Sequence, residues 1–159
     1  MTIVRRRARE LGIAPGQYGP GELNAITDVP GVRVGQVTVM REPDLNTGVT
    51  AIVPDQLRER GALPAGLFVG NGYGKLVGAT QLAELGEIET PIVLTGTLSA
   101  FKAADALVSY MLDLPGNEQM QSVNPIVGET NDGFLSDIRS RPISEVHVLT
   151  ALRETSDGP

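Results

Sequence analysis

The chain has 159 residues, of which 41% are hydrophobic, and a net charge of −6, a size and composition typical of one globular domain. The acidic balance argues against a surface that binds nucleic acid, because such surfaces are built from clustered Lys and Arg. The absence of Cys excludes disulfides, thiolate metal sites and a cysteine nucleophile.

The first 23 residues carry no pattern of a helix or a strand. Residues 14–23 are too rich in Pro and Gly for either element, so we predict an extended arm over residues 1–23. The basic run Arg5-Arg6-Arg7 is typical of a solvated terminal cluster rather than of a nucleic-acid arm. No apolar run reaches the length of a signal peptide or the ~18 residues of a membrane span, so we expect a soluble cytoplasmic protein that contacts no membrane.

Two strands are predicted next. Valines alternate over residues 32–39, but their phase changes near Gly35, which predicts a strand with a β-bulge at that glycine. Residues 48–54 indicate a second strand, which ends at Pro54. We expect the two strands to form an antiparallel pair.

A glycine-rich turn is predicted in the middle of the chain. Residues 67–69 indicate a short strand that ends at Asn71-Gly72-Tyr73-Gly74, and a helical pattern follows over residues 76–85. Such an order can place backbone N–H groups around an anion, but the glycine spacing is one residue longer than G-x-G-x-x-G, and there is no Walker motif. A tight turn is therefore favoured over nucleotide binding, and Asn71 and Gly72 are kept as candidate pocket residues.

The second half alternates strands and helices. Residues 91–95 indicate a buried strand, and Ser99 is placed to cap a helix that ends at Pro115-Gly116. Its apolar residues recur at helical spacing: Phe101, Ala104, Val108, Met111 and Leu112. Residues 125–128 indicate another short strand, and Ser144 is placed to cap a final helix.

The final helix is expected to carry the apolar residues Val146, Leu149 and Leu152, with Ile143 packed against Val148. Helices and strands alternate in the middle of the chain, whereas the first two strands pair directly. This order favours a mixed α/β sandwich over a doubly wound parallel sheet.

The densest polar cluster of the second half follows the strand at residues 125–128. It contains Glu129, Asn131, Asp132 and Asp137. A carboxylate pairs most strongly with an ammonium where water is scarce, so the cluster is a candidate site for a cationic group; the alternative is that these side chains cap the next turn and helix. The cluster has no histidine and lacks the calcium-loop spacing, so we expect no metal.

His147 is the only histidine of the chain. A Ser-His-Asp triad requires it beside a serine and an acid, but the sequence contains no G-x-S-x-G motif. We therefore expect a structural or surface role for His147.

Several blocks of the sequence, in order and spacing, resemble one known family. They are residues 7–13, 24–35, 47–52, 71–74, 89–95 and 127–138. The most specific blocks are Asn24-Ala25-Ile26-Thr27-Asp28-Val29 and Glu129-Thr130-Asn131-Asp132-Gly133. Together they resemble the L-aminopeptidase/D-amidase-esterase and β-peptidyl aminopeptidase family over nearly the whole chain.

The resemblance implies a four-layer αββα sandwich similar to N-terminal-nucleophile hydrolases but with different connectivity. Residues 1–159 then correspond to the N-terminal portion of a single hydrolase domain, incomplete in this chain. Members of the family cut themselves, and the new N-terminal Ser or Thr of the small chain becomes the nucleophile, activated by a nearby base. The resemblance therefore implies no catalytic residue in this chain, no cofactor, and three kinds of partner: the rest of the large chain, the small chain, and further copies in a homo-oligomer.

The resemblance also implies roles for two residues in substrate binding. Glu129 matches the carboxylate that holds the free amino group of the peptide or amide substrate, and Asn131 stands where some members have a pocket-lining Tyr. The implied activity is that of an aminopeptidase or amidase acting through an acyl-enzyme. An acyltransferase of similar architecture and an inactive binding or assembly subunit are the alternatives, and the preference among L-, D- and β-residues stays open.

Overall fold

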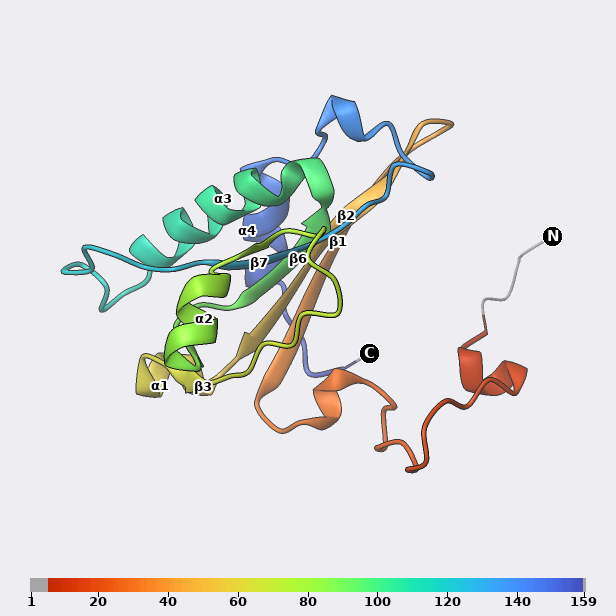
Figure 1. The fold of residues 1–159 in the computed structure, drawn as a ribbon, viewed down its shortest axis with the longest axis horizontal. Helices are drawn as coiled ribbons and strands as arrows, with labels where there is room; N and C mark the ends of the chain where they lie inside the picture. Colours follow the sequence, from red (N-terminus) through yellow and green to blue (C-terminus); the bar gives the residue numbers. More distant parts are fainter. Residues whose placement is uncertain (1–5, 159) are drawn as a thin grey trace.

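The structure is a computed structural model and describes residues 6–158. Its main feature is a five-stranded sheet with the strand order β1-β2-β6-β7-β4 (Figure 1). The strands are β1 (Val32–Arg41), β2 (Leu45–Pro54), β6 (Ile92–Gly96), β7 (Ile126–Thr130) and β4 (Leu76–Val77). A separate two-stranded sheet pairs β3 (Leu63–Pro64) with β5 (Glu87–Ile88).

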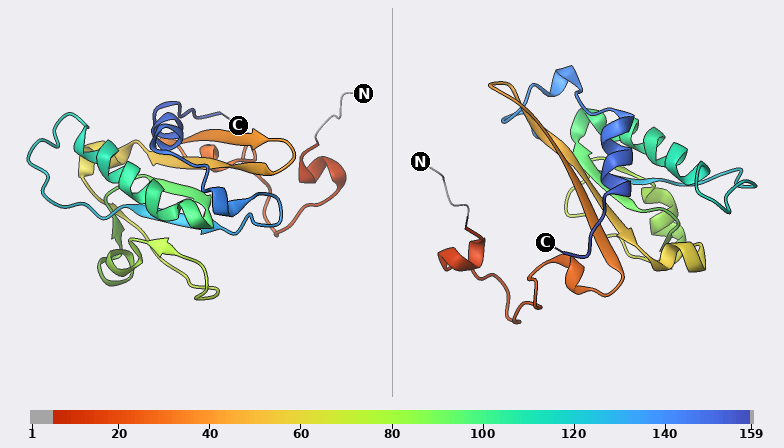
Figure 2. Two further views of the ribbon diagram at one scale, coloured as in Figure 1. Left: turned by 90° about the horizontal axis from the view of Figure 1, so that it is seen from above. Right: turned by 180° about the vertical axis from the view of Figure 1, so that it is seen from behind.

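Helices cover the two faces of the main sheet unequally. Helices α3 and α4 pack on one face, and α2 lies with the two-stranded sheet over part of the other (Figure 2). The helices are α1 (Gln56–Arg60), α2 (Ala79–Leu85), α3 (Ala100–Leu112) and α4 (Glu145–Arg153), with 3₁₀ turns η1 (Ala8–Leu11), η2 (Ile26–Asp28), η3 (Thr97–Ser99) and η4 (Ile138–Ser140). The predicted mixed α/β class is confirmed. Within residues 6–158, no helix has the length and apolar character needed to cross a membrane.

The antiparallel pairing of β1 with β2 is confirmed, but the predicted bulge at Gly35 is wrong. The register runs unbroken along both strands, and Gly35 lies opposite Ala51. A Cβ atom at Gly35 would lie 1.9 Å from the carbonyl oxygen of Ala151 in α4. The phase change therefore has another cause: the glycine occupies a core-facing position where the backbone of α4 leaves no space for a side chain.

The central strands β6 and β7 are parallel, while the other pairs of the main sheet are antiparallel. Thr95 lies opposite Glu129, and Gly96 lies opposite Thr130. Both strands therefore end at the same edge of the sheet, where α3 begins after η3 (Figure 1). This edge positions the candidate site.

The core lies between the sheet and the pair α3 and α4, and it buries only part of the apolar set that recurs along α3. Phe101 and Leu112 are 64% and 47% exposed. The buried residues of α3 are Ala100, Ala103, Ala104, Ala106, Leu107 and Met111. Alanines dominate because small side chains let the helix approach the sheet and α4 closely.

The final helix likewise buries only part of its apolar residues. Val146 is 68% exposed, whereas Val148, Ala151 and Leu152 are buried. Ile143 is buried in the same core cluster as Val148, as expected. Ser144 precedes the helix, and its backbone N–H donates to Nδ1 of His147 at 3.1 Å, which gives the histidine the structural role that we expected.

The region between β2 and β6 differs most from the prediction. Residues 67–69 form no strand, and Leu76–Val77 pairs with β7 as β4 instead of opening a helix. Helix α2 begins only at Ala79, after Gly78, whose φ is +83°. A Cβ atom at Gly78 would lie 2.5 Å from Cδ1 of Ile126, so the tight turn falls at this glycine rather than at Gly72.

The described part of the predicted arm, residues 6–23, contains one short helical turn. Residues 14–23 contain no helix or strand, but Ala8–Leu11 forms the short turn η1. The guanidinium of Arg7 donates to the backbone carbonyls of Leu23 and Asn24, which ties the two ends of the arm together. The first five residues of the predicted arm lie outside the described residues.

Candidate active site

The candidate site lies where β6 and β7 end side by side. Glu129 is the fourth residue of β7, and Thr97 follows the last residue of β6. The side chain of Glu129 is only 7% exposed, although it lies one residue from the end of its strand. A carboxylate with so little access to water requires hydrogen-bond donors.

Lys75 supplies these donors from the segment that precedes β4. Its backbone N–H donates to Oε1 of Glu129 at 3.0 Å, and its Nζ donates to Oε2 at 2.9 Å. The same Nζ donates to Oγ1 of Thr97 at 2.9 Å. Glu129 and Thr97 thus form a pair of acceptors that hold one ammonium group.

These contacts decide the charge of Glu129. Burial by itself raises the pKa of the Glu129 carboxyl, but the hydrogen bonds from Thr97 and Lys75 and the positive charge of Lys75 outweigh it. The pKa therefore lies below its ordinary value, and Glu129 is ionised at neutral pH. An ionised, buried carboxylate is the group that binds a cation most strongly.

The lowered pKa gives a prediction for the pH dependence of stability. A carboxyl whose pKa is lower in the folded than in the unfolded state stabilises the fold above its unfolded pKa, about 4.3 for Glu, and this contribution is lost as the pH falls through the folded value. We expect the difference in unfolding free energy between wild type and Glu129→Gln to be constant from pH 6 to 8 and to shrink in acid. Denaturant unfolding at a series of pH values measures it, and a difference that grows in acid contradicts the assignment.

A second carboxylate lies near the same edge. The hydroxyl of Thr47 donates to Oδ2 of Asp132, and a Cβ atom at Gly96 would lie 2.7 Å from that oxygen. Oδ1 of Asp132 is buried and has no hydrogen-bond partner among the described residues. The end of β6 is therefore flanked by two carboxylates, of which Glu129 holds a cation and Asp132 retains a free acceptor.

The side chains of the other predicted site residues make local hydrogen bonds within their own loops. Asn131 is exposed, and its Oδ1 accepts from the backbone N–H of Gly133 at 3.1 Å. Asn71 is exposed too and accepts from the N–H of Tyr73, while Gly72 has open space around it. Their contact with a substrate stays a prediction.

Asp137 takes the alternative role of a cap. Its Oδ1 accepts from the backbone N–H of Arg139 at the start of η4. In the described part of the chain, no group of three or more His, Asp or Glu side chains is placed to hold a metal ion.

Sequence reasoning missed Lys75 and Thr97. Lys75 directly follows the glycine-rich segment 71–74, and its ammonium pairs with a carboxylate that lies 54 residues away in the sequence. The signal that could have found Thr97 was the pair of short strands predicted at residues 91–95 and 125–128. If two such strands are parallel neighbours, their carboxyl ends and the residues that follow lie at one edge of the sheet.

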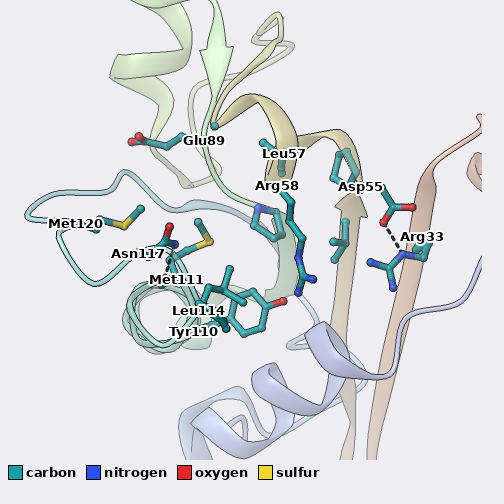
Figure 3. Close-up of a pocket in the computed structure, with 15 residues that line it drawn as sticks. Arg33, Asp55, Leu57, Arg58, Glu89, Tyr110, Met111, Leu114, Asn117 and Met120 are labelled. Carbon is teal, nitrogen blue, oxygen red and sulfur yellow. Dashed lines mark hydrogen bonds and ion pairs between the residues drawn. The ribbon is translucent and has the colours of Figure 1, made fainter.

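Two of the cavities in the described part of the chain lie at different ends of the sheet. One of about 400 Å³ runs along β1, β2 and β6 and reaches Thr130 and Asp132 beside the candidate site. The other, of about 260 Å³, lies at the far ends of β6 and α3, where Tyr110, Met111 and Leu114 face Leu57 and Arg58 (Figure 3). Of these two cavities, only the first is lined by a carboxylate of the candidate site, that of Asp132.

Comparisons with known proteins agree on one family. Residues 24–159 match the family model described as peptidase family S58. The chain is 36% identical to the β-peptidyl aminopeptidase BapA of Sphingosinicella microcystinivorans, over 96% of the chain and 40% of the relative. It therefore spans less than half the length of this curated relative.

Solved structures give the same result. The chain superposes on a β-aminopeptidase of Burkholderia sp. with a TM-score of 0.87 at 40% identity, covering 97% of this chain and 44% of that one. The match to the L-aminopeptidase D-Ala-esterase/amidase of Ochrobactrum anthropi has a TM-score of 0.84 at 34% identity. It covers 98% of this chain and 46% of that one. The latter is described as a prototype of the serine aminopeptidases and a variant of the Ntn hydrolase fold.

Proposed function

The chain belongs to peptidase family S58, and from this premise we propose that the complete protein is an aminopeptidase or amidase that releases N-terminal residues from peptides, amides or esters. One observation carries the proposal: the buried carboxylate of Glu129 and the hydroxyl of Thr97 together hold an ammonium group, that of Lys75. A site that accepts a lysine ammonium has the chemistry needed for the free amino group of a substrate.

Anchoring that amino group determines which bond reacts. An ammonium fixed at Glu129 places the adjacent amide or ester carbonyl at a constant distance, and this positioning supplies the proximity contribution to the rate. The nucleophile is a Ser or Thr hydroxyl outside this chain, which attacks the carbonyl once a base has removed its proton. The leaving amine or alcohol departs, and water hydrolyses the acyl-enzyme.

The remaining parts of the proposal concern partners. The site is completed by the rest of the large chain and by a small chain that begins with the nucleophile, and the whole forms a homo-oligomer in the cytoplasm without a cofactor. Asn131 follows Glu129 by two residues on the loop after β7, and we place it at the border of the substrate pocket. The relatives' names include a β-aminopeptidase and an L-aminopeptidase that is also a D-Ala-esterase/amidase, so the stereochemistry of the substrate stays open.

Self-cleavage gives the direct test. We expect mass spectrometry of the purified complete protein to show two chains, of which the smaller begins with Ser or Thr, and we expect its replacement by Ala to leave one uncut, inactive chain. An uncut wild-type protein that hydrolyses no amide would contradict the proposal and support an inactive assembly subunit. Product analysis with a competing amine separates the hydrolase from an acyltransferase, which would pass the acyl group to the amine.

A further inference from the structure

The contact between Lys75 and Glu129 raises a question about how a substrate enters. The ammonium of Lys75 already occupies Oε2 of Glu129 and Oγ1 of Thr97. One carboxylate neutralises one positive charge. A substrate ammonium added beside Lys75 would have to share the carboxylate of Glu129 with the lysine, in a position that has little contact with water, and like charges at such distances repel.

We propose that Lys75 is a displaceable competitor for the substrate: its ammonium fills the amino-group position in the free protein and leaves when the substrate amine binds. The inference rests on the proposed function, because it assumes that Glu129 is the anchor for that amine. Lys75 then contributes to substrate specificity, because only a substrate with a group that can replace an ammonium on a carboxylate binds at Glu129.

The geometry allows the side chain to leave while the carboxylate stays in place. Oε1 of Glu129 is held by the backbone N–H of Lys75 and only Oε2 by the ammonium. The Lys75 side chain is 37% exposed, against 7% for Glu129, so its long, flexible stem has a path to solvent. The backbone contact thus orients the acceptor, and the side-chain contact is the part that is exchanged.

The two acceptors left behind match a primary ammonium. When Nζ leaves, Oε2 of Glu129 and Oγ1 of Thr97 both lose this donor, which lay 2.9 Å from each of them. An N-terminal ammonium has three N–H donors, as the lysine ammonium does, and makes the same two hydrogen bonds. A substrate with a blocked amine lacks the charge and gains nothing by displacing Lys75.

The test compares Lys75→Met with Lys75→Arg in the complete protein. Met removes the charge but keeps an unbranched side chain and the backbone N–H, whereas Arg keeps the charge. We expect Lys75→Met to lower KM for a free-amine anilide by about two- to fivefold, the range that corresponds to a partly exposed ion pair, and to leave KM for the N-acetyl anilide unchanged. Lys75→Arg is expected not to lower KM. An unchanged or raised KM for the free amine in Lys75→Met would overturn the proposal.

A second measurement covers the case in which Lys75→Met does not fold. NMR signals of the lysine side chains are followed in the wild-type complete protein during titration with n-butylammonium, with n-butanol as the uncharged control. Release of Lys75 predicts that its signals move toward those of a solvent-exposed lysine with the ammonium alone. Saturation without movement of these signals, or no binding of n-butylammonium, overturns the proposal.

The two proposals fail in distinguishable ways. If Glu129→Ala raises KM equally for free and blocked substrates, the anchor itself is misassigned. If Glu129→Ala discriminates between them but Lys75→Met does not lower KM, the anchor stands and Lys75 is a permanent structural partner of the carboxylate.

Discussion

Replacing Glu129 by Ala in the complete protein is expected to raise KM for free-amine substrates by about 30-fold, and to change KM for N-blocked counterparts by less than about threefold. The estimate follows from the loss of a hydrogen bond to a charged group, worth about 2 kcal/mol. The effect depends on charge, because Glu129 is ionised and buried, and a blocked amine forms no ion pair. Steady-state kinetics on matched free and N-acetyl substrates measure it.

Two controls separate anchoring from general damage. Glu84→Ala removes an exposed carboxylate on α2, and both KM values should stay at wild-type levels. The double variant with Lys75→Met removes the unpaired lysine that Glu129→Ala leaves behind, so a double-mutant cycle isolates the contribution of the carboxylate. An equal loss on free and blocked substrates would show that Glu129 supports the fold of the site and does not recognise the amine.

The strongly patterned elements of the fold were predictable from sequence. Strands β1, β2, β6 and β7 and helices α3 and α4 were expected close to where they occur, because local periodicity and caps determine them. The short strand β4 was not, since its two residues are a strand only through pairing with β7, about 50 residues further along the chain. Pairing of this kind leaves no local pattern.

The buried faces of the helices were harder to predict than the helices themselves. Phe101 is one of the apolar residues that recur at helical spacing, but it is exposed, and the buried face of α3 is built largely from alanines such as Ala100 and Ala103. Close approach between backbones favours small residues. A search for large apolar side chains at helical spacing does not detect this requirement.

The candidate site was also predictable only in part. Glu129 was predictable because an acid that directly follows apolar strand residues stands out locally, and the family resemblance pointed to the same residue. Its partners Lys75 and Thr97 are separated from each other by 22 residues and meet only because β4, β6 and β7 end or begin near one edge. A site assembled from three segments requires the strand order, which the sequence pattern did not supply.

Replacing Gly35 by Ala is expected to lower the free energy of unfolding by about 3 kcal/mol or more, at the upper end of the usual cost of overpacking a core. The added Cβ would lie 1.9 Å from the carbonyl oxygen of Ala151 and 3.1 Å from Cγ2 of Thr155. A backbone atom cannot rotate away as a flexible side chain does, so β1 or α4 must shift. Denaturant unfolding of the complete protein measures the loss.

The cost is large because α4 cannot move away from β1 without separating residues that are packed in the core. Val148, Ala151 and Leu152 are buried against the sheet and α3, so displacing the helix opens cavities in the core. Gly66→Ala is the matched control: Gly66 is exposed, has nothing within 4 Å of a built Cβ, and should change stability by no more than about 0.5 kcal/mol. A Gly35→Ala protein as stable as this control would mean that α4 does not lie as close to β1 as the structure places it.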